Sequence, residues 1–128
     1  GCCDIQMGNR IGAVMEDITF ENIEVYMNHN DGLCNVYIGG SGGRGEGYGT
    51  VRNIYFKNIT AYRNYGAFLN VRTYDSVNCF IYDLYLDNIV SNGILLTPEN
   101  YTEAGYVTDN VVGGYDEERY LHINTLSE

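Results

Sequence analysis

The sequence predicts an all-β protein, a single-stranded right-handed parallel β-helix (a solenoid) of about four to five rungs. Strand-favouring residues are abundant, because Ile, Val, Thr, Tyr and Phe make up 46 of the 128 residues. Turn formers are abundant too, with 16 Gly and 15 Asn against one Pro. One motif also recurs at intervals of 36 and 30 residues, a spacing typical of solenoids.

The recurring motif is an alternating strand that includes the pair Asn-Ile. It is found at residues 16–23, 52–59 and 82–89. Apolar and polar positions alternate within it, as at Ile18 and Phe20 or Ile54 and Phe56, which predicts strands with one buried face. We expect the Asn-Ile pair to end each strand and to start the next short one.

The aligned asparagines of the motif are Asn22, Asn58 and Asn88. Parallel strands lie about 4.8 Å apart, so like residues of successive rungs stack on one another. We expect the three side chains to point inward at a turn and to form an Asn ladder. Such a ladder satisfies buried amides and is a structural feature rather than a ligand site.

A second set of short strands is expected between the repeats. It comprises residues 4–7, 35–38, 69–72 and 94–96, with a last pair at 107–112 and 120–123. A chain of this length holds one domain at most. We expect one partial β-helix domain, 1–128, with rungs at about 1–34, 35–67, 68–93 and 94–128. The alternative fold, a β-sandwich, would use tight Asn-Gly or Asp-Gly hairpins, and both dipeptides occur once.

The charge excludes one class of partner. The formal net charge is −10, and residues 99–128 carry seven acids and one base. Nucleic acid is not expected as a partner, because its binding depends on Lys and Arg contacts to phosphate. The excess also disfavours a polyanionic polysaccharide and leaves a neutral polysaccharide or oligosaccharide open.

Membrane insertion is not expected either. A membrane-spanning helix needs about 20 apolar residues, and no apolar run in the sequence approaches this length. Residues 1–4 carry neither the basic nor the apolar region of a signal peptide, and the sequence leaves localisation open.

No metal or cofactor is expected. The four cysteines are Cys2, Cys3, Cys34 and Cys79. They lack CxxC spacing, so we expect no zinc site and mostly reduced, buried thiols. The Gly-rich segment 39–49 contains GxGxxG, but a dinucleotide site needs a helix directly after it, and residues 51–56 read as a strand.

Candidate substrate-binding residues are polar or aromatic side chains in or beside the predicted strands. Arginine can orient sugar hydroxyls, aromatic rings can stack on pyranose rings, and the segment 39–49 could act as a flap over a cleft. The candidates are Gln6, Asn9, Arg10, Tyr37, Arg44, Tyr48, Arg72, Tyr74 and Asp75. A structural interpretation stays open for each of them, as a surface arginine, a strand tyrosine or part of a connecting loop.

No catalytic residue is assigned. Glycoside hydrolysis needs two carboxylates that flank the scissile bond. The sequence places acids side by side only at Glu16-Asp17, which opens a repeat, and at 116–118, in the acidic tail. His122 stands alone in a predicted terminal strand and is interpreted as structural.

The rungs resemble those of the pectin-lyase-like superfamily. The repeated Ile-x-Phe-x-Asn-Ile is common in glycoside hydrolase family 28, the polygalacturonases. A closer resemblance is to glycoside hydrolase family 49, the dextranases and isopullulanases. It rests on three short motifs that lie within 1–114, at 5–8 (Ile-Gln-Met-Gly), 36–42 (Val-Tyr-Ile-Gly-Gly-Ser-Gly) and 109–114 (Asp-Asn-Val-Val-Gly-Gly).

The resemblance implies the C-terminal rungs of a polysaccharide-acting glycosidase. The catalytic aspartates of both families lie upstream of the matched region, so none can be carried over to this chain. Asn9-Arg10 also stands where family 49 commonly has an aromatic, and the Arg-Ile-Lys strand of polygalacturonases has no counterpart. We therefore expect an inactive fragment, and the alternative is a non-catalytic carbohydrate-binding or assembly module. Open solenoid ends also predict self-association, through a terminal rung such as residues 2–7.

Overall fold

The computed structural model describes residues 5–9, 11–26, 32–38, 48–73, 79–103, 105–111 and 117–124. Strands dominate this part of the chain, and the all-β class predicted from composition is confirmed. The elements are β1 (Ile5–Asn9), β2 (Ile11–Val25), β3 (Gly32–Ile38), β4 (Tyr48–Ala61), β5 (Ala67–Thr73), β6 (Cys79–Ser91), β7 (Ile94–Leu95), β8 (Val107–Asn110), α1 (Glu117–Tyr120) and β9 (Leu121–Asn124).

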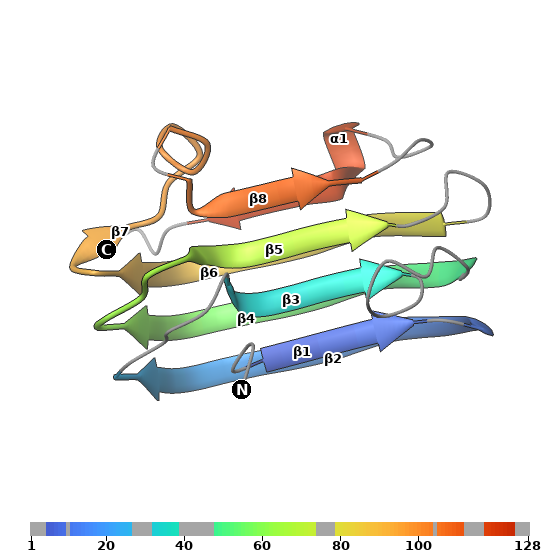
Figure 1. Cartoon of the computed structure of the whole chain (residues 1–128), viewed down its shortest axis with the longest axis horizontal. Coiled ribbons are helices and arrows are strands. Elements are labelled where there is room, and N and C mark those ends of the chain that lie inside the picture. Colours follow the sequence, from blue (N-terminus) through green and yellow to red (C-terminus); the bar gives the residue numbers. More distant parts are fainter. Residues whose placement is uncertain are drawn as a thin grey trace.

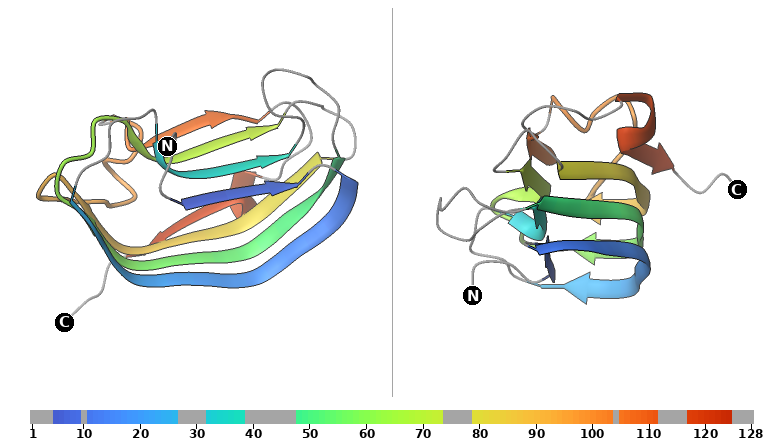
Figure 2. Two further views of the ribbon diagram at one scale, coloured as in Figure 1. Left: turned by 60° about the horizontal axis from the view of Figure 1, so that its bottom comes forward. Right: turned by 90° about the vertical axis from the view of Figure 1, so that its right-hand side faces the viewer.

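The strands form two sheets that face each other (Figures 1 and 2). One sheet has the order β1-β3-β5-β8 and is parallel throughout. The other has the order β2-β4-β6, with β9 parallel to β6 and the two-residue β7 antiparallel to it. From β1 to β6 the chain passes from one sheet to the other at every step, so each strand pairs with the strand two places later.

The strand register stacks like residues on like. Ile18, Ile54, Leu84 and Leu121 follow one another across four strands of the second sheet. The neighbouring apolar column contains Phe20, whose ring stacks on that of Phe56 with centroids 5.4 Å apart. The three repeats recognised in the sequence therefore lie in the register that their alignment predicts.

Each long strand bends at two residues with left-handed backbone conformation, five positions apart. These residues are Asp17 and Asn22 in β2, Asn53 and Asn58 in β4, and Asp83 and Asn88 in β6, with φ between 52° and 58°. Asn and Asp tolerate this conformation better than other residues with a Cβ. In β4 the buried positions fall at 49, 51, 54, 56, 59 and 61, so each bend inserts one extra outward residue. Figure 2 shows the resulting curvature of the long strands.

The stacked asparagines face outward, which corrects the expectation that they point inward. Asn58 Nδ2 donates to Asn22 Oδ1 at 3.3 Å, and Asn88 Nδ2 donates to Asn58 Oδ1 at 2.9 Å. Asn22 and Asn58 are exposed, because the adjoining isoleucines occupy the inward positions of the bend. Backbone pairing resumes on the far side of each bend, so the motif does not end the strand as expected.

The core lies between the two sheets. Phe68 of β5 meets Phe56 of β4 edge to face, with centroids 6.3 Å apart, which joins the two sheets in one cluster. The predicted burial of reduced cysteines is confirmed for Cys34 and Cys79, which are buried thiols in this core. Cys2 and Cys3 lie outside the described residues.

The strand expected at 94–96 does not belong to the set in which it was placed. Asn92 and Gly93 both have positive φ, 53° and 80°, the pattern of a two-residue type I′ hairpin loop. The chain therefore turns back on β6 as the antiparallel β7. The fourth position of the first sheet is taken by β8, within the expected strand 107–112.

Candidate functional site

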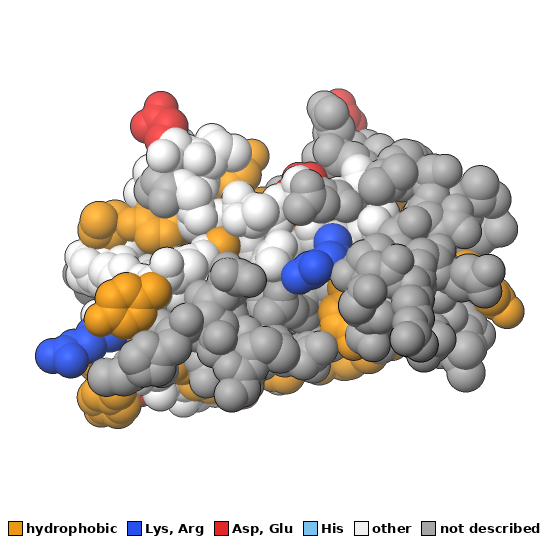
Figure 3. Space-filling view, viewed as in Figure 1, with side chains coloured by type: hydrophobic (Ala, Val, Ile, Leu, Met, Phe, Trp, Pro, Cys, Tyr) orange, Lys and Arg blue, Asp and Glu red, His pale blue; other side chains and the backbone are white. Residues whose placement is uncertain are grey.

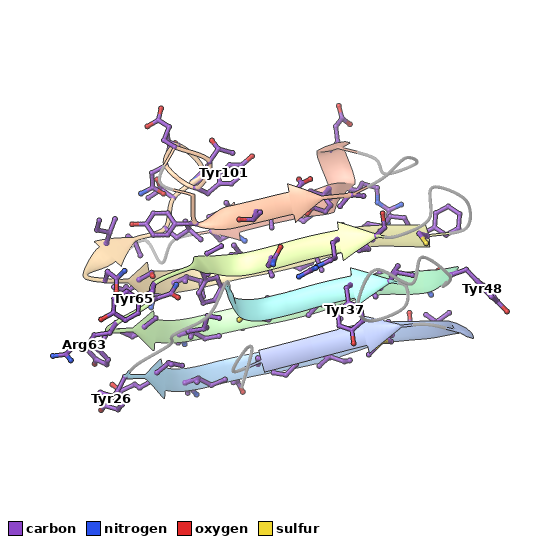
Figure 4. All side chains as sticks on the ribbon, viewed as in Figure 1. Tyr26, Tyr37, Tyr48, Arg63, Tyr65 and Tyr101 are labelled. Carbon is purple, nitrogen blue, oxygen red and sulfur yellow. The ribbon has the colours of Figure 1, made fainter. Side chains whose placement is uncertain are left out.

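The first sheet brings two of the predicted binding residues side by side. Tyr37 of β3 is directly opposite Arg72 of β5, and the same row continues to Gly8 of β1 and Asn110 of β8. Tyr37 and Arg72 are both half-buried. Figure 4 shows Tyr37 on the sheet face that is turned toward the viewer.

A second row of polar residues crosses the same four strands. It consists of Gln6, Asn35, Asn70 and Thr108. Asn70 is a polar residue but is buried, with 7% of its surface exposed. In the neighbouring row, Arg72 supplies a planar set of hydrogen-bond donors. Together with the Tyr37 ring, this chemistry suits neutral, hydroxyl-rich ligands.

Of the other predicted site residues, Gln6 belongs to the second row by its backbone register, and the rest are not brought to either row or lie outside the described residues. Tyr48 begins β4 in the opposite sheet and is exposed, at the end of the molecule labelled in Figure 4. Gln6 and Asn9 lie in β1, where the backbone alone is described. Outside the described residues are Arg10, Arg44, Tyr74 and Asp75, with segment 39–47 of the expected flap.

Acidic groups are scarce on the first sheet. Asp109 of β8 is the one carboxylate in its four strands. On the face shown in Figure 3, acidic side chains lie toward the upper edge, and a basic group lies nearer the centre. The four strands thus lack the carboxylate pair that glycoside hydrolysis requires. Across the described part of the chain, no group of three His, Cys, Asp or Glu could hold a metal ion.

A second polar cluster lies at the β6–β9 end of the other sheet. Asp83 accepts a hydrogen bond from Arg119 at 3.0 Å, and its other oxygen lies 3.0 Å from His122 Nε2. The His122 ring also stacks on Tyr85, with centroids 4.6 Å apart, and Tyr85 stacks on Tyr55 at 4.5 Å. The cluster ties β9 and α1 to β6, so the structural role predicted for His122 agrees with its contacts.

The electrostatics of this cluster depend on Asp83. Burial by itself raises the pKa of the Asp83 carboxyl, but hydrogen bonds from His122 and Arg119 outweigh it, and the pKa lies below its ordinary value of 3.8. Sequence reasoning missed Asp83 and Arg119. The available signal was the column of Asp17, Asn53 and Asp83, because a carboxylate at a bend of a stacked strand needs a partner.

Replacing Asp83 with asparagine is expected to lower the free energy of unfolding at pH 7 by about 1–2 kcal/mol, since charge-assisted hydrogen bonds are lost. The lowered pKa means that the carboxylate stabilises the fold above pH 3.8, and that this contribution is lost as the pH falls through the folded-state pKa. The difference between wild type and variant should therefore shrink below about pH 4. Urea unfolding at pH 7 and pH 3 measures this difference in the free energy of unfolding.

Asp87→Asn, on the same strand, is the matched control. An equal loss of stability in both variants would contradict the prediction.

A third cluster lies where β2 and β4 end. The Tyr26 and Tyr62 rings stack with centroids 5.0 Å apart, and their hydroxyls donate to the two oxygens of Glu24 at 3.0 and 3.2 Å. These hydrogen bonds to Glu24 raise the pKa of both tyrosines above 10.0. Both tyrosines are exposed, so this cluster lies on the surface of the molecule.

Comparison with known proteins does not assign the chain to a family. The chain has no significant match among protein-family models, curated proteins or solved structures. Among the described residues, no helix is long and apolar enough to cross a membrane.

Proposed function

We propose that the two sheets are the walls of a single-stranded right-handed parallel β-helix of the pectin-lyase-like kind, with four rungs in the described part. The strand pairs β1–β2, β3–β4, β5–β6 and β8–β9 would each supply one rung. The support is the alternation of the chain between two parallel sheets and the stacking of side chains in columns. Right-handedness follows from the strong preference of crossovers between parallel strands.

This β-helix binds a neutral polysaccharide or oligosaccharide on the outer side of the β1-β3-β5-β8 sheet. The observation that carries the proposal is the register of Tyr37 against Arg72, beside the polar row that contains Asn70. Tyrosine supplies a flat apolar surface for a sugar ring, and arginine supplies hydrogen bonds to hydroxyls. The net charge of −10 favours a neutral glycan over a polyanionic one.

The binding face belongs to a fragment of a polysaccharide-acting glycoside hydrolase, similar to family 49 or family 28. Its catalytic carboxylates would lie upstream of residue 1. The four strands of the face carry the single carboxylate Asp109, which supports binding without hydrolysis by this chain.

Replacing Tyr37 or Arg72 with alanine is expected to weaken binding of a neutral glycan by about tenfold, because each removes about 1.4 kcal/mol of stacking or hydrogen bonding. Isothermal titration against a panel of dextran and pullulan oligosaccharides measures the affinities. Matched controls are Tyr65→Ala and Arg63→Ala, both exposed and both far from Tyr37 in Figure 4. The controls should bind as the wild type does.

Two results would contradict the proposal in different ways. Binding that is equally weakened by the control pair, or absent in the wild type, would remove the Tyr37–Arg72 face as a glycan site. Release of reducing sugar from dextran or pullulan by the wild-type chain would show that catalysis does not need upstream carboxylates.

The second candidate function is assembly through the open sheet edges, including the self-association expected from the sequence. The specific observation is the difference in burial between β2 and β4. Ile54 and Ile59 of β4 are fully buried, whereas Ile18 and Ile23 at the same positions of β2 are partly exposed.

A further inference from the structure

The strand β2 lies at one edge of its sheet and pairs on one side with β4. Its inward side chains Ile18 and Phe20 pack against the core but are only partly buried. Ile54 and Phe56, their partners in β4, have 0% and 1% of their surface exposed. The apolar columns therefore end at β2, and the described residues do not cover the outer edge of this strand. A long edge strand of this kind is a template for pairing with a further strand.

The outward side chains of β2 are strongly acidic. Glu16, Asp17, Glu21 and Glu24 lie on this strand, and β2 contains no Lys or Arg. The strand that pairs with it supplies the opposite charge: Arg52 forms an ion pair with Glu16 at 2.6 Å, and Lys57 is opposite Glu21. Between β2 and β4, acidic side chains are thus paired with basic ones, and apolar side chains are paired with apolar ones.

We propose that the open edge of β2 accepts one further parallel strand with the residue pattern of β4. This strand would carry basic residues opposite Glu16 and Glu21, Asn or Asp opposite the bends at Asp17 and Asn22, and apolar residues over Phe20. The inference rests on the proposed β-helix and deepens it, since it specifies the chemistry of a strand that would stack on the open edge of β2.

The outer strands of this sheet in a second copy do not have such a pattern, because β2, β7 and β9 contain no Lys or Arg. Two β2 strands brought together would set carboxylates against carboxylates, which is unfavourable for residues directly opposed across strands. The β4 pattern of a second copy is already paired on both sides, with β2 and β6. At the β2 edge, charge complementarity therefore favours a basic, β4-like strand over a second copy of this chain.

A labelled peptide that copies residues 48–61, the whole of β4, tests the proposal on the full chain. The control peptide has the same length and carries Arg52→Glu and Lys57→Glu. At low ionic strength, fluorescence anisotropy should show binding of the β4 peptide that is about tenfold tighter than binding of the control, because two attractive cross-strand pairs become repulsive. The preference should fall as salt is added.

Two protein variants locate the binding edge. Glu21→Lys should reduce the ratio of the affinities for the β4 peptide and the control peptide, because it reverses one charge on β2. Glu103→Lys makes the same change of net charge at an exposed position outside the strands, and it should leave the ratio unchanged.

Three results would overturn the proposal: equal binding of both peptides, no saturable binding of the β4 peptide, or a wild-type dimer in light scattering that excludes the peptide. Glycan titration of the same samples separates this proposal from the proposed function. If the chain binds glycan but not the β4 peptide, only the edge-strand proposal is rejected. If it binds the β4 peptide but not glycan, only the glycan site is rejected.

Discussion

Replacing Phe56 with alanine is expected to lower the free energy of unfolding by about 3–5 kcal/mol, the largest effect of any single change considered. The side chain is 1% exposed, and its ring contacts Phe20 in the neighbouring strand and Phe68 in the opposite sheet. Alanine would leave a cavity where three strands of two sheets meet, and close-packed surroundings cannot fill it completely. Urea denaturation, with the slope held common to both proteins, measures the loss.

Phe20→Ala is the matched control, because it removes the same ring from the same column at the sheet edge. Phe20 is only partly buried, so we expect a loss of about 1–2 kcal/mol. A loss as large as that of Phe56→Ala would show that β2 is covered in solution, as it would be in an assembly. A small loss for both would contradict a core that continues from one sheet to the other.

Replacing Asn58 with leucine is expected to lower the free energy of unfolding by about 2–3 kcal/mol, despite the exposure of the side chain. Two costs add. The backbone at Asn58 is left-handed, with φ of 52°, which leucine tolerates poorly. The amide also bonds to Asn22 on one side and to Asn88 on the other, and leucine can make neither bond. Thermal unfolding should show the loss as a melting temperature lower by about 10 °C.

Asn58→Gly separates the two costs. Glycine adopts the left-handed conformation without strain but lacks the amide, so about 1 kcal/mol of destabilisation should remain. If the glycine variant is as unstable as the leucine variant, the hydrogen bonds dominate. An unchanged melting temperature in the leucine variant would rule out a stabilising role for the stacked asparagines.

Much of the fold could be predicted from the sequence because stacked parallel strands repeat their pattern. The alignment of Ile18 with Ile54 and Leu84 is the same in sequence and in register. The outward position of Asn58 could not be predicted, because alternation alone does not show that a left-handed residue adds one outward position. Strand β7 was misplaced because Ile94 and Leu95 read as a buried strand, whereas the Asn92-Gly93 turn decides their pairing.

The candidate site was predictable only in part. Tyr37 and Arg72 lie 35 residues apart, yet they belong to equivalent strands, so the repeat itself places them in one row. Tyr48 begins β4 in the opposite sheet, and its place beside the Gly-rich segment gave no information about which sheet it enters. Asp83 and Arg119 were missed because their contact joins two elements that no shared motif relates.

The parallel pairing has a consequence for the rate of folding. Residues that pair across strands are separated by 29 residues between Ile5 and Cys34, by 30 between Ile54 and Leu84, and by 38 between Leu69 and Val107. No parallel pair can form before a loop of about this length closes, and closure costs chain entropy that later contacts must offset. High contact order of this kind slows folding to milliseconds or longer. Once one loop has closed, each further turn of the chain adds to an existing edge, so growth outward from the first pair is faster than its formation.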